Sequence, residues 1–197
     1  MIFLGLAAAT VRAGEPSSQN PVDSLYLKGQ LLVASPEIQD PRFMESVIYM
    51  VNHDQSGAFG LIINKSYGSG PLKEFLKGFD VDVSGVEGTI NLYFGGPVMP
   101  GAGFVLHTAD YEGPGTNAVN KDFAVTTEKI IMQAIAEGRG PRNSLFAYGY
   151  SGWGPGQLEN EIRRGDWLSA PADMDLVFDT DQKTKWKRAS GKARLKL

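Results

Sequence analysis

The chain has 197 residues, of which 42% are hydrophobic, and this is enough for one ordinary globular core. It contains no cysteine, which excludes a thiol nucleophile, a disulfide, an iron–sulfur cluster and a cysteine-bound zinc ion. The net charge is −3, yet the segment from Lys183 to the C-terminus holds seven basic residues and no acidic one, so the preceding body is strongly acidic and direct nucleic-acid binding by it is not expected.

Residues 1–24 predict an N-terminal extension. Residues 2–11 are apolar, and Val11 and Ala13 resemble the small-residue pattern before a signal-peptidase site, but no Lys or Arg precedes the apolar run. The run is too short to span a bilayer. Glu15–Asp23 is polar and contains two prolines, which is typical of a linker. Export directed by residues 1–13 therefore stays open as an alternative, and no membrane span is predicted.

Three strands are predicted at the start of the domain, which we place at residues 25–189. They are Leu27–Ala34, Val47–His53 and Phe59–Asn64, of which the second is rich in β-branched and aromatic residues. Asp54–Gly57 has turn chemistry and predicts a hairpin between the second and third strands. Their nearly continuous apolar character indicates that both faces of the sheet are covered.

The middle of the chain alternates short elements with glycine-rich breaks. Gly68–Gly70 predicts an interruption, and an amphipathic helix is predicted to begin at Pro71, an allowed first helical position. Two strands are predicted at Ile90–Phe94 and Gly103–Thr108. Asp110–Lys121 predicts a long loop.

The last third predicts helices and two more strands. Val125–Thr127 predicts a threonine N-cap for the first of these helices. The predicted elements are a helix at Glu128–Glu137, a strand at Leu145–Tyr148, a helix at Pro155–Arg164, a strand at Leu176–Phe178 and a helical turn at Thr184–Ala189, before a basic tail at residues 190–197. Hairpins and irregular alternation predict a single α+β domain with a central mixed, largely antiparallel sheet flanked by a few short helices.

Ser151 lies in the stretch from Tyr148 to Gly152, which follows a predicted strand and is similar to the G-x-S-x-G nucleophile elbow. The fifth position is Trp153 instead of glycine, and the helix follows too late for an elbow. The alternative function is therefore a small hydrolase or transferase that uses Ser151 or His53 with a carboxylate such as Asp40 or Glu159.

The predicted helix after this stretch presents two neighbouring polar side chains. Gln157 and Glu161 are four residues apart and share one face, whereas Glu159 is rotated away and is interpreted as an acidic first turn. Trp153 and Trp167 flank the helix, and their indole N–H groups need partners if they are buried.

Asp40 and Arg42 flank Pro41 in an irregular loop, where binding groups concentrate, and they can pair with each other or reach a ligand. His53 ends a strand. We assign no catalytic residue, metal site or cofactor, because Gly95–Gly103 lacks the order of a phosphate-binding loop and Asp179 with Asp181 is too little for a cation site. The candidate binding surface consists of Asp40, Arg42, His53, Ser151, Trp153, Gln157 and Glu161.

Several long segments together resemble the AlgH/YqgE family of bacterial proteins. They are Leu27–Lys65, FGGPVMPGAGFVLHT at Phe94–Thr108, AYGYSGWGPGQLENEI at Ala147–Ile162, WLSAPADMDLVFD at Trp167–Asp179, and Lys185-Trp186. The resemblance covers residues 25 to 189 and implies an α+β domain with a central sheet flanked by helices, usually cytoplasmic, in a family without an established biochemical activity.

One member of that family is linked to transcriptional control of exopolysaccharide synthesis, but no DNA-binding motif is visible in this chain. The N-terminal extension departs from the family pattern and keeps export open beside the cytoplasmic location. Because glycine, proline, aromatic and apolar residues dominate the shared segments, we expect a non-enzymatic module that binds a small molecule or a protein partner and has an indirect regulatory role, including regulation of transcription.

Overall fold

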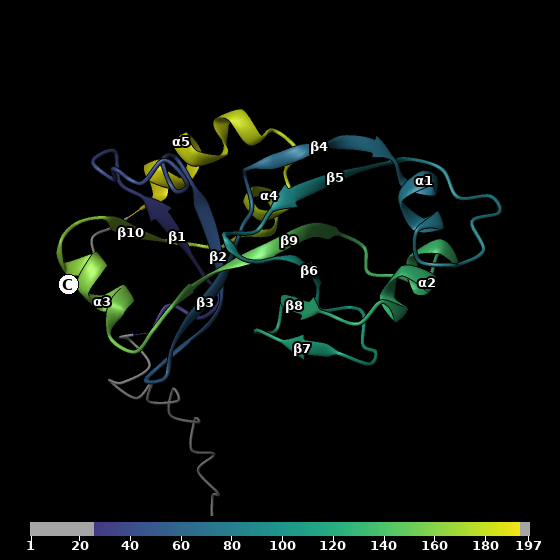
Figure 1. Cartoon of the computed structure of the whole chain (residues 1–197), viewed down its shortest axis with the longest axis horizontal. Coiled ribbons are helices and arrows are strands. Elements are labelled where there is room, and N and C mark those ends of the chain that lie inside the picture. Colours follow the sequence, from purple (N-terminus) through teal and green to yellow (C-terminus); the bar gives the residue numbers. More distant parts are fainter. Residues whose placement is uncertain (1–25, 194–197) are drawn as a thin grey trace, which may run out of the picture.

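A computed structural model describes residues 26–193, whose strands join into one curled sheet (Figure 1). The strands are β1 (Gln30–Ala34), β2 (Val47–Asp54), β3 (Gly57–Ile62), β4 (Ser66–Pro71), β5 (Thr89–Phe94), β6 (Val98–Thr108), β7 (Thr116–Ala118), β8 (Phe123–Thr126), β9 (Ser144–Trp153) and β10 (Trp167–Pro171). The helices are α1 (Leu72–Lys77), α2 (Ile130–Ala136), α3 (Gln157–Arg163), α4 (Met174–Val177) and α5 (Gln182–Lys192). The predicted extension 1–24 and residues 194–197 of the predicted tail lie outside the described residues.

The main path of the sheet runs β10-β1-β2-β3-β9-β6-β8-β7, and all of its neighbours are antiparallel. Strand β5 leaves this path: it pairs with β9 in parallel and with β4 in antiparallel orientation. The predicted α+β domain with a mixed, largely antiparallel sheet is confirmed. No helix within residues 26–193 is long and apolar enough to cross a membrane.

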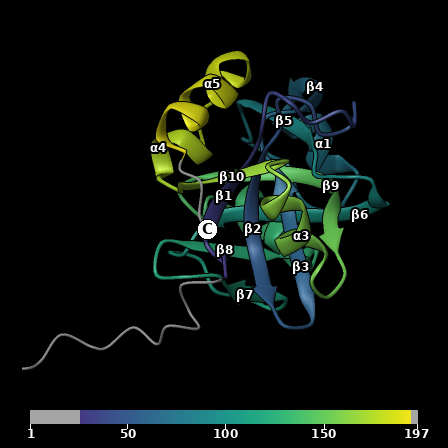
Figure 2. The same ribbon diagram turned by 90° about the vertical axis from the view of Figure 1, so that its left-hand side faces the viewer.

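Both faces of the first strands are covered, as their continuous apolar sequence predicts. In β1, Leu31 and Val33 pack in the cluster that includes residues of α4 and α5, whereas Leu32 packs in the cluster that includes Leu158 of α3. Because successive side chains of a strand point to opposite faces, these two clusters lie on either side of the sheet. Figure 2 shows α4 and α5 on one side of β1 and β10, and α3 on the other.

Strand β9 is longer than predicted and joins the two ends of the molecule. The predicted turn after Tyr148 is wrong, because the strand continues to Trp153 and pairs there with β3. Its Gly149 has a φ of 70° and crosses the link between β5 and β6 so closely that a Cβ would lie 2.3 Å from the carbonyl oxygen of Gly96. Glycine therefore permits a backbone crossing here, since any side chain would occupy the same space.

Four further predictions are corrected. The strand predicted at Leu176–Phe178 is wrong: Leu176 and Val177 belong to helix α4 and Phe178 is its C-cap, because the Asp173 side chain accepts a hydrogen bond from the backbone N–H of Leu176 and caps a helix. The predicted threonine cap is wrong as well: Thr126 ends the buried strand β8, and α2 begins at Ile130 without a side-chain cap. The predicted break at 68–70 lies inside β4, and the predicted loop 110–121 contains β7.

Candidate functional site

Five of the seven candidate residues lie around one cavity of about 590 Å³ at one end of the molecule. We call this cavity the α3 cleft. Its walls come from the loop at residues 37–43, the end of β9, helix α3 and the start of β10. The candidates that line it are Asp40, Arg42, Trp153, Gln157 and Glu161.

Glu161 is the most connected polar group of the α3 cleft. Its Oε2 accepts hydrogen bonds from the indole Nε1 of Trp153 at 2.8 Å and of Trp167 at 2.9 Å. Its Oε1 accepts a bond from Nε2 of Gln157 at 2.9 Å, one helical turn earlier. The two tryptophans are 7% and 1% exposed, so the carboxylate satisfies two N–H groups that would otherwise be buried without a partner.

The chain folds locally so that these groups meet. Gly156 adopts a left-handed conformation with a φ of 73° and is the N-cap of α3, which therefore begins at Gln157 and not at the predicted Pro155. The Oε1 of Gln157 accepts a bond from the backbone N–H of Gly154 at 3.1 Å. Gln157 thus links the end of β9 to Glu161 and fixes the orientation of the carboxylate.

Three aromatic rings form a row along the cleft. The ring of Trp167 packs edge-on against that of Trp153, with centroids 5.9 Å apart, and against that of Phe43, with centroids 5.6 Å apart. Both arrangements are near-perpendicular contacts of the kind that aromatic pairs prefer. The cleft therefore has a fixed apolar wall next to a fixed carboxylate.

Arg42 and Asp40 form a rim ion pair. The guanidinium donates from NH2 to Oδ2 of Asp40 at 2.6 Å and from Nε to Oδ1 at 3.0 Å, and these bonds lower the pKa of the Asp40 carboxyl below its usual value. The Nζ of Lys65 donates to the Arg42 carbonyl at 3.0 Å, and Asn64 donates to the Glu45 carbonyl at 2.8 Å. Asn64 and Lys65, which lie shortly after β3, therefore hold the loop that carries Arg42.

The charges that line the cleft are mostly negative. Glu37 and Asp166 add to Asp40 and Glu161, against two guanidinium groups. The second guanidinium, Arg164, donates to Asp166 at 2.6 Å. Four carboxylates against two guanidiniums favour cationic groups and N–H donors over anions.

His53 and Ser151 do not line this cleft. The Nδ1 of His53 accepts a bond from the backbone N–H of Leu27 at 3.1 Å, so the proton is on Nε2, which faces Oε1 of Glu159 at 3.3 Å. The hydroxyl of Ser151 is fully buried and donates to the carbonyl of Gly95 at 3.3 Å. Both ring nitrogens and the hydroxyl are thus engaged, and this geometry does not form a nucleophile–base pair of Ser151 and His53.

Other polar groups outside the cleft are bound to neighbours. His107 is fully buried and bonds to the Thr108 carbonyl and the Thr126 hydroxyl, so it is a satisfied core histidine. Asp179 pairs with Arg188, and Asp181 caps α5. Within residues 26–193, no group of three or more His, Cys, Asp or Glu side chains is arranged to hold a metal ion.

The cleft also contains Phe43, Arg164 and Asp166, which are not among the residues predicted from the sequence. The pair Arg164 and Asp166 has the same i, i+2 spacing as Asp40 and Arg42, and that repetition of an Arg–Asp pair beside each wall is the signal that could have identified it. Phe43 carries no such signal, because its contact with Trp167 depends on the path of a loop.

Comparison with known proteins gives the family. Residues 31–197 match the family model described as AlgH-like. A UPF0301 protein of Methylococcus capsulatus is 47% identical over 169 residues, which are 86% of this chain and 92% of that protein. A UPF0301 protein of Afipia carboxidovorans is 41% identical over 93% of this chain and 91% of its own length.

Solved structures agree with this assignment. The solution structure of the AlgH protein from Pseudomonas aeruginosa is similar with a TM-score of 0.70 and 34% identity, over 92% of both chains. The crystal structure of a Corynebacterium diphtheriae protein has the same fold, with a TM-score of 0.64 at 20% identity over 90% of this chain and 87% of its own. The chain belongs to the AlgH-like family.

Proposed function

We propose that this chain is a non-enzymatic binding module whose α3 cleft holds a small molecule, or a side chain of a protein partner, that presents N–H donors or a positive charge. The indirect regulatory role expected from the sequence, including regulation of transcription, would then act through that ligand or partner. The observation that carries the proposal is the fixed Glu161 carboxylate at the end of an aromatic wall.

The state of the polar groups supports binding over chemistry. A carboxylate that already accepts three hydrogen bonds is oriented before any ligand arrives, and it keeps lone pairs free for further donors. The indoles of Trp153 and Trp167 are locked by the same bonds. A preorganised site of this kind reduces the entropy that binding would otherwise lose.

The rim supports a charged ligand. Arg42 is bound to Asp40 and Arg164 to Asp166, so neither guanidinium is free to attract an anion without breaking an existing pair. A cationic or amide N–H group instead meets Glu161 without any rearrangement. An aromatic or planar cation also matches the row of rings formed by Phe43, Trp167 and Trp153.

The three tryptophans of the chain provide the test. In ¹H–¹⁵N spectra of the full chain, a library of guanidines, amines and amino-terminated peptides is expected to shift the indole N–H signals of Trp153 and Trp167. Trp186 donates its indole N–H to the Ala34 carbonyl at 2.9 Å and does not line the cleft, so its signal is the internal control.

Matched variants assign the effect to Glu161. The substitution Glu161→Gln keeps an oxygen acceptor for the indoles but removes the charge, and affinity for a cationic hit should fall roughly tenfold. Glu159→Gln, on the same helix but directed at His53, should leave affinity unchanged. Equal effects of the two variants, or a library that leaves both cleft tryptophans unshifted, would contradict the proposal.

A further inference from the structure

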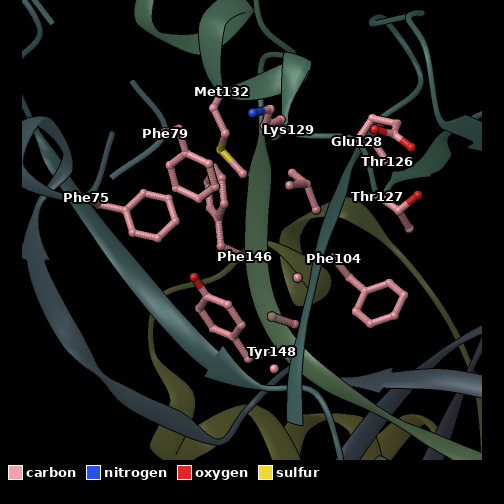
Figure 3. A pocket seen from close by; sticks show the side chains of 14 residues that line it. Phe75, Phe79, Phe104, Thr126, Thr127, Glu128, Lys129, Met132, Phe146 and Tyr148 are labelled. Atoms are coloured by element: carbon pink, nitrogen blue, oxygen red, sulfur yellow. The ribbon is translucent and has the colours of Figure 1, made fainter. Parts of the chain in front are cut away.

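A second cavity, of about 320 Å³, lies at the opposite end of the molecule from the α3 cleft and is independent of the function proposed above. It is lined by α1 and α2 with the residues next to them, the middle of β6, the end of β8 and the first half of β9, and Figure 3 shows it from close by. We call it the α1–α2 cavity. Its volume is at the lower end of the range for small-molecule sites, so its occupant is small.

Aromatic rings form the inner wall of this cavity. The ring centroid of Phe75 lies 5.1 Å from that of Phe79 and 5.4 Å from that of Phe146, with inclined planes in both pairs. Phe75 and Phe79 are only partly buried, and Figure 3 shows both rings beside the open space with the Met132 side chain above them. The exposed ring surfaces and a thioether are partners for another ring in an edge-on or offset contact.

Two polar groups face the cavity without a partner in the described part of the chain. The Tyr148 hydroxyl points into it from β9, and the Lys129 ammonium lies at its mouth on the side of Phe79 and Met132 (Figure 3). Neither group forms a side-chain hydrogen bond or ion pair within residues 26–193, unlike the polar groups of the α3 cleft.

Glu128 is the one acidic residue that lines the cavity, and it packs toward another element. Its Cγ would lie 2.3 Å from a Cβ placed on Gly115, so the side chain is seated on the turn before β7. The ammonium of Lys129 is therefore the charge closest to the aromatic wall in the close-up view (Figure 3).

We propose that the α1–α2 cavity binds a small ring-bearing carboxylic acid. The ring packs among Phe75, Phe79 and Phe146, and the carboxylate pairs with Lys129 at the mouth. The Tyr148 hydroxyl bonds a polar substituent on the ring at the inner end. Small-molecule sites are typically apolar pockets in which a few polar groups fix the orientation of the ligand. In this cavity the aromatic rings form the apolar wall, and Lys129 and the Tyr148 hydroxyl are the polar groups.

The test is a titration of the full chain with 3-phenylpropionate and, in parallel, with the neutral 3-phenylpropanamide, followed in ¹H–¹⁵N spectra. The acid should shift signals of α1, α2 and the first half of β9. The amide should bind roughly fivefold more weakly, because Lys129 is solvent-exposed and a pair at an exposed site adds only modest affinity.

Two variants with matched controls separate binding from folding. Lys129→Met should weaken binding of the acid to the level of the amide, whereas Lys73→Met, an exposed lysine of α1 that does not line the cavity, should not. Gly103→Leu places a side chain in the cavity, where a Cβ meets only the Tyr148 ring at 3.8 Å, and should abolish binding. Gly70→Leu in β4, where nothing lies within 4 Å of the Cβ, is its control.

Three outcomes of the titrations in the α1–α2 cavity, and one outcome at the α3 cleft, would overturn the proposal. The first three are an acid that does not bind up to its solubility limit, an amide that binds as tightly as the acid, and binding that survives Gly103→Leu in a folded variant. Shifts confined to the α3 cleft would also overturn it, and because the indole signals report that cleft separately, such a result is distinguishable from failure of the proposed function.

Discussion

The α3 cleft and the α1–α2 cavity lie at the two ends of β9 and satisfy their polar groups in opposite ways. In the cleft, Glu161 binds the two indoles and Gln157, and each arginine has its aspartate. In the cavity, Lys129 and Tyr148 have no side-chain partner within residues 26–193. The difference predicts that Glu161 and the arginine–aspartate pairs of the cleft contribute to stability, whereas Lys129 and the Tyr148 hydroxyl of the cavity contribute only to binding.

Strand β9 is common to both regions. A substitution that disrupts the crossing of β9 with the β5–β6 link should therefore affect both regions and have the largest effect on stability. A Cβ at Gly96 would lie 2.2 Å from the carbonyl carbon of Tyr150, at a φ of 149°. Gly96→Ala should therefore lower the free energy of unfolding by about 4 kcal/mol or more. Chemical denaturation measures this change.

The control is Gly101→Ala, because nothing lies within 4 Å of a Cβ there. That variant should stay within about 0.5 kcal/mol of the wild type. A Gly96→Ala protein with wild-type stability would show that the backbone of β9 does not contact the β5–β6 link at Gly96. The idea that the cleft and the cavity both depend on this crossing would then be wrong.

The cleft could be foreseen from the sequence to a larger extent than the cavity because its contacts are local. Gln157 and Glu161 are one helical turn apart, so the helical pattern predicts that they meet, and both tryptophans lie within eight residues of Glu161 in the chain. The need of buried indoles for acceptors points to the same group. The approach of the Asp40–Arg42 loop depends on Lys65 and Asn64, which carry no recognisable pattern.

The cavity could not be foreseen because its walls are assembled by topology. Phe75 and Phe79 follow helical spacing, but spacing does not reveal that α1 packs against Phe146 of β9. The end of strand β8 lies where the sequence predicts a helix start, since a short, mostly apolar run before a helical pattern does not distinguish a strand from a first turn. The sequence predicts too short a β9, because the glycines inside this strand are typical of a turn.

The second largest effect should come from Glu161 in the cleft. Glu161→Ala removes the shared acceptor of two buried indole N–H groups and should lower the free energy of unfolding by about 2 kcal/mol. Glu161→Gln retains an oxygen acceptor and should cost about half as much. Both are measured by denaturation followed by tryptophan fluorescence.

Glu159→Ala is not a neutral comparison, since its carboxylate faces His53, so exposed Glu74 of α1 is the better control. Glu161→Ala with the stability of Glu74→Ala would mean that water replaces the lost acceptor. In that case the cleft would no longer differ from the cavity in the way described above.

A smaller effect, dependent on pH, is expected at His107, which bonds Thr126 of the cavity wall. Burial lowers the pKa of His107 below its usual 6.5, while the hydrogen bond to the Thr108 backbone and the charge of Asp110 act in the other direction without reversing it. The unfolded chain therefore binds this proton more readily, so stability present above pH 6.5 is lost as the pH falls from there toward the lowered folded value.

The check is the difference between the wild type and His107→Gln in free energy of unfolding, followed from pH 7.5 downward in parallel denaturation curves. Every other ionisable group is present in both proteins, so the difference isolates His107. A difference that does not change with pH would show that His107 is not buried as a neutral ring. The contribution of His107 to the free energy of unfolding would then not depend on pH.

The smallest change in stability is expected at Tyr148, and it tests the difference between the cleft and the cavity most directly. Tyr148→Phe removes a half-buried hydroxyl that forms no hydrogen bond within the described residues, so the free energy of unfolding should stay within about 0.5 kcal/mol of the wild type. The same variant should weaken binding of a hydroxylated phenylpropionate in the cavity and leave that of plain phenylpropionate unchanged. A clear loss of stability would mean that the hydroxyl is already used by the fold, as Glu161 is in the cleft, and that it is not held free for a ligand.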